Sequence, residues 1–129
     1  MFSYPLVQEP WGLEEYDAMN KVIASKQFTM GKKVKEFENE FAKYIGSKYA
    51  VMVNSGSSAN LLAVASLFFK KHDPLVRDDE VIVPAVSWST TYSPLYQHGL
   101  KLKFVDIDLH TLNYDLKSLE NAITDKTKM

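Results

Sequence analysis

Short apolar runs rich in β-branched residues alternate along this chain with segments of helical period. The runs cover residues 49–53, 80–84 and 101–107, and helical segments at 61–69 and 88–98 separate them. Strands that alternate with helices favour a parallel sheet with right-handed crossovers. The sequence therefore predicts an α/β fold.

Helical spacing also marks the first part of the chain and its last part. Residues 13–23 carry apolar side chains at helical spacing, and Gly31 interrupts the pattern. Residues 34–45 repeat the spacing up to Gly46, a residue type that favours the C-terminal cap of a helix. A last helix is expected at residues 116–123.

These patterns predict an N-terminal arm with the first helix at residues 1–31, and a partial α/β domain at residues 32–129. Residues 127–129 follow the last helix, where the alternation predicts another strand. A parallel sheet of only three strands leaves unpaired backbone groups at its edges. The sequence therefore indicates a truncated domain.

Composition excludes several classes of protein. Of the 129 residues, 46% are apolar and 24% charged, with a formal charge of −1, so bulk nucleic acid or a membrane surface is not an expected partner. The chain has no cysteine, which excludes disulfides, thiolate nucleophiles and Cys-ligated metals. No signal peptide precedes the arm, and no apolar run approaches the ~20 residues that span a bilayer. We expect a cytoplasmic protein.

The sharpest local feature is the segment 54–60, Asn-Ser-Gly-Ser-Ser-Ala-Asn, between an expected strand and a helix. The first amides of a helix are unpaired and carry partial positive charge. Gly56 lets an anion approach the backbone, and the hydroxyls of Ser57 and Ser58 add donors, so a phosphate site is one interpretation. The other is a helix cap built from serine and glycine.

A second feature is the segment 84–91, which follows the second expected strand and contains Trp88. Ligands of open α/β sheets bind beyond the carboxyl ends of the strands, where the segment 54–60 is also expected. Trp88 could stack there on a flat ring. Alternatively, its indole packs a helix against the sheet.

The third feature is a pair of carboxylates at the end of the last expected strand, Asp106 and Asp108. Two carboxylates could bind a metal ion, but no histidine or glutamate stands close to them in the sequence. A role in capping or in holding the loop is the better interpretation.

Isolated basic side chains give weaker signals. His72, His98 and His110 lack the spacing of a metal site or a catalytic triad, so surface positions are expected. Lys32 and Lys33, next to Gly31, could meet an anionic substrate or remain solvated.

Taken together, these segments resemble the DegT/StrS family of PLP-dependent sugar aminotransferases and dehydratases. The similarity covers nearly the whole chain in family order, at residues 28–41, 50–61, 79–84, 99–108 and 111–113. Residues 3–6, 48–53 and 83–91 are especially similar to the 3-dehydratase branch of that family. That branch acts on 4-keto-6-deoxy hexoses linked to GDP or CDP, on the route to the dideoxy sugars of lipopolysaccharide O-antigens.

The resemblance implies a fold, a cofactor and partners. Residues 32–129 would form the N-terminal part of the large domain of type I PLP-dependent transferases, which is built as a homodimer. Gly56 and Ser57 would hold the phosphate of pyridoxal 5'-phosphate (PLP) or pyridoxamine 5'-phosphate (PMP), and Trp88 would stack on its pyridine ring. The substrate would be a nucleotide sugar.

The resemblance also implies what this chain lacks. The carboxylate that contacts the pyridine nitrogen, and the catalytic lysine or histidine, lie beyond residue 129 in the family. We therefore expect no catalytic residue in this chain and no turnover by the chain alone. The alternatives are a sugar aminotransferase, or a truncated product that is either an inactive remnant or an oligomerisation domain.

Overall fold

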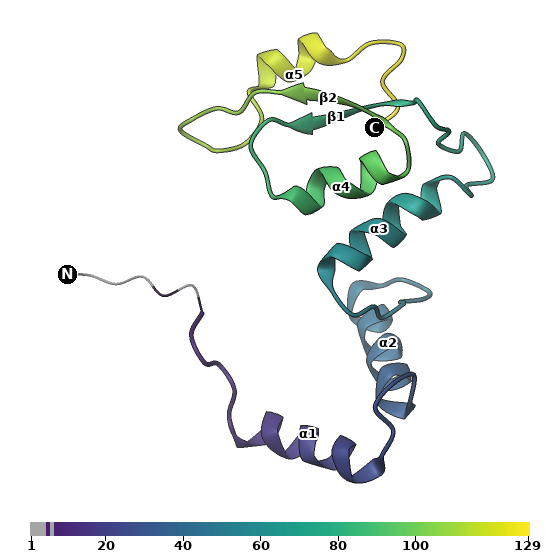
Figure 1. The fold of residues 1–129 in the computed structure, drawn as a ribbon, viewed down its shortest axis with the longest axis vertical. Coiled ribbons are helices and arrows are strands. Elements are labelled where there is room, and N and C mark those ends of the chain that lie inside the picture. The colour runs from purple at the N-terminus through teal and green to yellow at the C-terminus, as the bar shows by residue number, and fades with distance from the viewer. Residues whose placement is uncertain (1–4, 6) are drawn as a thin grey trace. The chain divides into compact units, whose positions relative to one another are not determined.

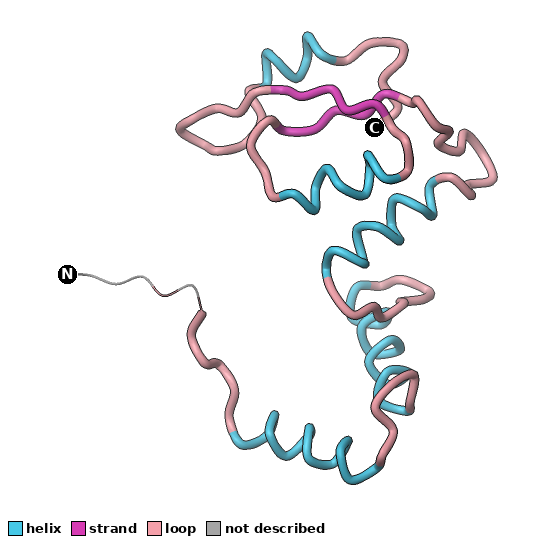
Figure 2. The backbone as a smooth tube through the Cα atoms, viewed as in Figure 1, coloured by secondary structure: helices cyan, strands magenta, loops and turns pink. Residues whose placement is uncertain are grey.

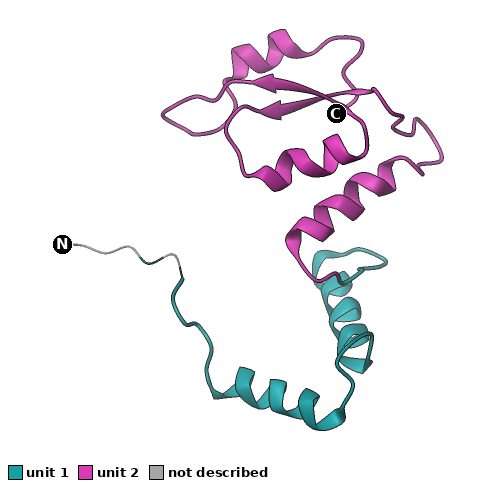
Figure 3. Cartoon of the chain, in the orientation of Figure 1, with its two compact units in different colours: residues 1–52 teal, residues 53–129 magenta. Residues whose placement is uncertain are grey.

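A computed structural model describes residue 5 and residues 7–129 of the chain (Figures 1 and 2). The backbone divides into two compact units, residues 1–52 and residues 53–129 (Figure 3), and each is described by itself. The resemblance at residues 3–6 falls mostly outside the described residues. The division expected between residues 31 and 32 remains a prediction.

The first unit contains helices α1 (Leu13–Ser25) and α2 (Lys32–Ile45), which confirms both expected helices. The amide of Gly12 donates to Glu15 Oε2 at 2.7 Å, so a carboxylate in the first turn closes the start of α1. At the end of α2, Gly46 adopts a φ of 71°, the left-handed conformation that glycine accepts at least cost.

The strand expected at residues 49–53 is not formed, and that prediction is wrong. The segment pairs with no strand in the described part of the chain, and the side chains of Tyr49 and Val51 are exposed. The amide of Met52 donates instead to Glu38 Oε1 at 2.9 Å. A strand needs a neighbour for its ladder of hydrogen bonds, and an apolar run alone does not supply one.

The second unit alternates helices and strands: α3 (Gly56–Leu67), β1 (Glu80–Pro84), α4 (Ser89–Gln97), β2 (Lys101–Val105) and α5 (Leu116–Ala122). β1 and β2 are parallel and pair in register over five residues. Figure 1 shows α4 on one side of the two strands and α5 on the other. These elements confirm the strand expected at 80–84 and the helices that follow both strands, whereas the strand expected at 101–107 ends at Val105.

Residues 127–129 run parallel to β1 through a short bridge, at the place where the alternation predicts another strand. The amide of Lys128 donates to the carbonyl of Glu80 at 2.9 Å, and the amide of Ile82 donates to the carbonyl of Met129 at 2.7 Å. The hydroxyl of Thr127 also donates to Glu80 Oε1 at 3.1 Å. β1 therefore has β2 on one side and the short segment 127–129 on the other.

The core of the second unit lies between β1 and the helices α3 and α4. Val81 and Val83 point into it with 0% and 2% of their surface exposed, and they alternate with half-buried residues along the strand. Leu95 of α4 and Leu100 complete its centre with Leu75. The partly buried side chains around it are Val64, Leu67, Phe68, Tyr92 and Leu102.

No helix in the described residues is long and apolar enough to cross a membrane.

Replacing Leu95 with alanine should destabilise the second unit. Leu95 is 5% exposed and belongs to the core cluster, so truncation removes buried apolar surface and leaves a cavity. We expect the free energy of unfolding to fall by about 2–5 kcal/mol, measured by urea denaturation followed by circular dichroism. Leu116→Ala is the matched control, because Leu116 is 77% exposed and should change stability by less than about 0.5 kcal/mol. Equal losses in the two variants would contradict this assignment of the core.

Candidate functional site

Helix α3 opens with a serine cap. Ser55 has extended backbone, and its Oγ accepts a hydrogen bond from the amide of Ser58 at 3.1 Å. The hydroxyl of Ser58 donates in turn to Asn54 Oδ1 at 2.7 Å. This cap satisfies one of the unpaired amides that every helix carries at its start, and it leaves the first two amides free.

Those two amides belong to Gly56 and Ser57. Neither amide has a hydrogen-bond partner among the residues that the structure describes, and the hydroxyl of Ser57 has none there either. A Cβ built on Gly56 would meet nothing within 4 Å, so the space in front of this turn is open. Two free amides and a hydroxyl at the positive end of a helix are a suitable donor set for a phosphate group.

The loop from β1 to α4 is held at its beginning by two hydrogen bonds. The amide of Ala85 donates to the carbonyl of Val105 at 2.7 Å, which extends the pairing with β2. The hydroxyl of Tyr92 donates to the carbonyl of Pro84 at 2.9 Å. The ring of Tyr92 packs edge-on against Phe104, with the ring centroids 5.5 Å apart.

Trp88 ends this loop as the N-cap residue of α4, and 77% of its surface is exposed. The structure thus excludes the interpretation that its indole packs in the core. The hydroxyls of Ser87 and Thr91, on either side of Trp88 in sequence, lie 2.8 Å apart and share a hydrogen bond. The indole is therefore a free aromatic face on a backbone that neighbouring contacts restrain.

A side-chain contact joins α3 to α4 close to both helix starts. Asn60 Nδ2 donates to the carbonyl of Thr90 at 3.4 Å, a long hydrogen bond. In a regular helix that carbonyl would accept from the amide of residue 94, but position 94 is a proline and has no amide hydrogen. We had not expected a role for Asn60 or Thr90, although Pro94 inside a predicted helix is a signal that one carbonyl needs another donor.

Between the two helices lies a hollow of about 160 Å³. Hydroxyl groups from both helices contribute to its wall, and Ser57 at the start of α3 stands at its edge. The lining residues are Ser57, Ser58, Leu61, Thr90, Ser93, Pro94 and Gln97.

Asp106 and Asp108 hold the loop after β2, as expected. Asp108 Oδ1 accepts from the amides of His110 and Thr111 at 2.9 and 2.8 Å. The hydrogen bond from the Thr111 amide is the main cause that lowers the pKa of Asp108. Within the described residues, no group of three metal-binding side chains includes either aspartate.

The histidines divide between surface and interior. His72 and His110 are exposed, as predicted. The surface prediction is wrong for His98, which follows the last turn of α4 and packs on Phe68 with the ring centroids 5.4 Å apart. Its Nε2 is buried and has no hydrogen-bond partner in the described part of the chain.

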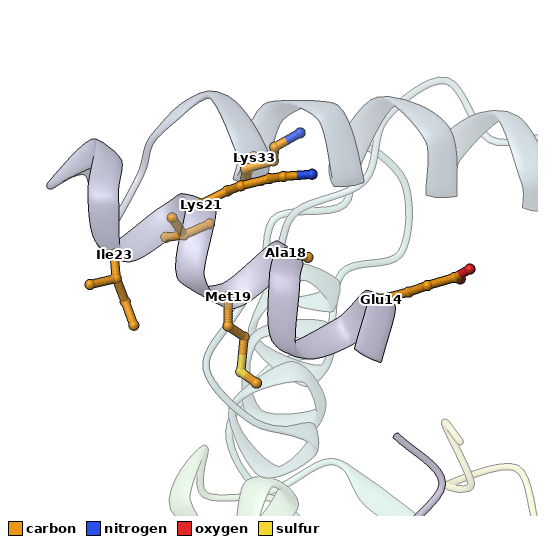
Figure 4. A pocket seen from close by; sticks show the side chains of 7 residues that line it. Glu14, Ala18, Met19, Lys21, Ile23 and Lys33 are labelled. Atoms are coloured by element: carbon orange, nitrogen blue, oxygen red, sulfur yellow. The ribbon is translucent and has the colours of Figure 1, made fainter. Parts of the chain in front are cut away.

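A larger hollow of about 610 Å³ lies within the first unit (Figure 4). Met19 and Ile23 of α1 form part of its apolar wall, whereas Lys21 and Lys33 extend alongside each other in a different direction in the view. Lys33 is paired with Glu36 on its own helix, which favours the interpretation of a solvated lysine over that of an anion site.

Removing the cap of α3 should lower stability. Ser55→Ala leaves the amide of Ser58 unpaired, and we expect a loss of about 0.5–2 kcal/mol in the free energy of unfolding, measured by urea denaturation. Ser66→Ala is the control on the same helix, because the Ser66 hydroxyl bonds only the carbonyl of Ala63 at 2.7 Å. A control variant as unstable as Ser55→Ala would refute the capping role.

The second unit is thus an α/β fold in which the start of α3 carries free backbone donors and the loop before α4 carries an exposed aromatic side chain. Residues 11–129 match the DegT/DnrJ/EryC1/StrS aminotransferase family, and the chain belongs to it. This confirms the resemblance noted in the sequence.

Two curated members of the family are especially similar to this chain. The chain is 60% identical to GDP-4-keto-6-deoxy-D-mannose 3-dehydratase of Escherichia coli O55:H7 and 58% identical to the enzyme of the same name from Yersinia pseudotuberculosis. Each alignment covers 99% of this chain and 33% of the relative, so the chain spans about a third of the length of these curated relatives.

Solved structures confirm the α/β fold. The E. coli dehydratase with bound hydrated PLP superposes with a TM-score of 0.90 at 60% identity, over 99% of this chain and 33% of that one. A Streptococcus pneumoniae protein described as a sugar aminotransferase, in its PMP form, superposes with a TM-score of 0.81 at 30% identity. That superposition covers 98% of this chain and 30% of the other.

Proposed function

We propose that this chain is part of a PLP- or PMP-dependent 3-dehydratase that acts on a nucleotide-linked 4-keto-6-deoxy hexose. Within it, the chain supplies the site for the cofactor phosphate at Gly56 and Ser57, and the face that stacks on the cofactor ring at Trp88. The substrate class follows from the relatives, since 60% and 58% identity link the chain to two dehydratases of this kind.

The open turn at the start of α3 carries the proposal for the cofactor. Two free amides, a free hydroxyl and the empty space in front of Gly56 fit a phosphate dianion. Trp88, whose indole is exposed, is the N-cap residue of the neighbouring helix α4. Helix α4 packs against α3. A phosphate site and a flat apolar face on adjacent helices match the two ends of a phosphorylated pyridine.

Bound PMP supplies the amine and the electron-withdrawing ring that such a dehydration requires. The residues of this chain bind and orient that group, since the amides of α3 hold an anion and the indole limits the tilt of a ring. An exposed aromatic face also excludes water from the side of the ring that it covers.

A sugar aminotransferase is the second candidate, favoured by the 30% identity to the S. pneumoniae protein. Both candidates need the same phosphate site and stacking face, so these residues do not separate them. A protein that carries this segment with the remaining two thirds of the relatives' length separates them by its product. Loss of the 3-hydroxyl supports the dehydratase, and an amine at C4 supports the aminotransferase.

We also propose that the protein acts as a homodimer in the cytoplasm. Phe37 and Phe41 of α2 stack on each other with their ring centroids 5.6 Å apart, and both remain substantially exposed. Aromatic residues exposed together favour a partner surface. A nucleotide-linked sugar is a charged metabolite that does not cross a bilayer unaided, so enzyme and substrate must share a compartment.

PMP should bind this chain and quench the fluorescence of Trp88. In a Trp11→Phe background Trp88 is the sole tryptophan, and PMP has no aldehyde that could react with lysines at random. We expect saturable quenching that inorganic phosphate reverses. Gly56→Val should raise the Kd for PMP at least about tenfold, because it blocks charge-assisted hydrogen bonds worth about 1.5–3 kcal/mol.

Gly56→Val tests the ligand site rather than the fold, because a Cβ added at position 56 meets nothing within 4 Å. Ser57→Ala should weaken PMP binding by a smaller factor, and Ser66→Ala, at the far end of α3, should leave it unchanged. Quenching that does not saturate, or that phosphate leaves intact, would rule out the phosphate site.

A further inference from the structure

We propose that Asn60 is a positioning residue for the cofactor site: its amide binds the carbonyl that Pro94 leaves free and so fixes the start of α4, with Trp88, relative to the start of α3. This inference rests on the proposed function and assigns a role to a residue that contacts neither phosphate nor ring in that proposal.

The placement of Asn60 is the first step. It lies four residues after Gly56 in α3, so the two residues occupy the same face of the helix one turn apart. Its acceptor, Thr90, lies two residues after Trp88. One hydrogen bond therefore connects the second turn of α3 with the first turn of α4, next to the proposed phosphate site and stacking face.

The acceptor exists because of Pro94. A helical carbonyl normally accepts from the amide four residues later, and the proline ring crowds that carbonyl. The carbonyl of Thr90 is thus available to a side chain from outside the helix. The neighbouring carbonyl of Ser89 accepts instead from the Ser93 hydroxyl of its own helix at 2.9 Å.

The loop from β1 to Trp88 is restrained by backbone contacts with Tyr92 and β2, and helix α4 after Trp88 is restrained by Asn60. Tyr92 holds the carbonyl of Pro84, and the pairing of Ala85 with β2 ties that end to the sheet. Among the hydrogen bonds of the described residues, the one from Asn60 is the one that joins α3 to α4. Loss of its donor should therefore free α4 to shift against α3 while both helices stay folded.

The test compares Asn60→Leu with its parent in the Trp11→Phe background, with PMP and inorganic phosphate as probes. Leucine keeps the size of asparagine and removes the donor. We expect the Kd for PMP to rise about two- to tenfold, which corresponds to one lost hydrogen bond, and the maximal quenching of Trp88 to fall. The inhibition constant of inorganic phosphate should stay unchanged, because the start of α3 is intact; a general loss of structure would raise it as well.

A second experiment repeats Asn60→Leu in a Pro94→Ala background. Alanine returns an amide to position 94 that can satisfy the carbonyl of Thr90, so Asn60→Leu should then cost less than in the parent. The matched control is Asn113→Leu, since Asn113 Nδ2 donates to the carbonyl of Thr111, also at 3.4 Å and also exposed, in the loop after β2. That variant should bind PMP like the parent.

The outcomes separate the two proposals. If the parent shows no phosphate-sensitive quenching, the proposed cofactor site is wrong, and the role of Asn60 is wrong with it. If the parent is quenched but Asn60→Leu matches it in affinity and amplitude, only the positioning role is overturned. Equal losses for Asn113→Leu, or an undiminished loss in the Pro94→Ala background, would overturn it as well.

Discussion

The parallel pairing of β1 with β2 is the constraint on which the second unit depends. Parallel strands cannot be joined by a tight turn, so helix α4 forms the crossover connection between β1 and β2. The pairing also brings the carboxyl ends of both strands to one edge, where the loop to α4 begins. Val81 and Val83, almost wholly buried, fix the face of β1 that receives the helices. Trp88 stands at the end of that loop, as the residue before the first turn of α4.

The apolar surface of the chain is larger than its own packing uses. α3 has no fully buried residue, although Leu61, Leu62 and their neighbours make it apolar on several sides. A helix of that kind is typical of a core covered on more than one face. The curated relatives are about three times as long as this chain, and further chain or a second copy could supply such a cover. We infer that these faces are covered in the working protein, which leaves the opening turn of α3 as its polar end.

The elements that the sequence predicted well are those whose signals are local. Helical period and a terminal glycine located α2, and residues 80–84 became a strand as expected. Residues 49–53 carry an equally clear strand pattern, but they have no partner strand among the described residues, and pairing is a non-local property that the local pattern does not contain. For the same reason the sequence left the exposure of Trp88 open. It could not reveal Asn60, whose contact joins positions 30 residues apart.

The energetics of Pro94 show why stability alone does not account for the contact between α3 and α4. A proline inside a helix costs about 3 kcal/mol relative to alanine, whereas the hydrogen bond from Asn60 contributes about 0.5–1.5 kcal/mol at best. Burial of the Pro94 ring between the helices offsets part of the difference, but alanine or leucine could also fill such a position without the helical penalty. Unlike alanine or leucine, proline has no amide hydrogen for the carbonyl of Thr90 in α4. That carbonyl can therefore accept a hydrogen bond from Asn60 of α3. A residue that weakens its own helix while tying that helix to its neighbour is better explained by the geometry of the site than by the stability of the fold.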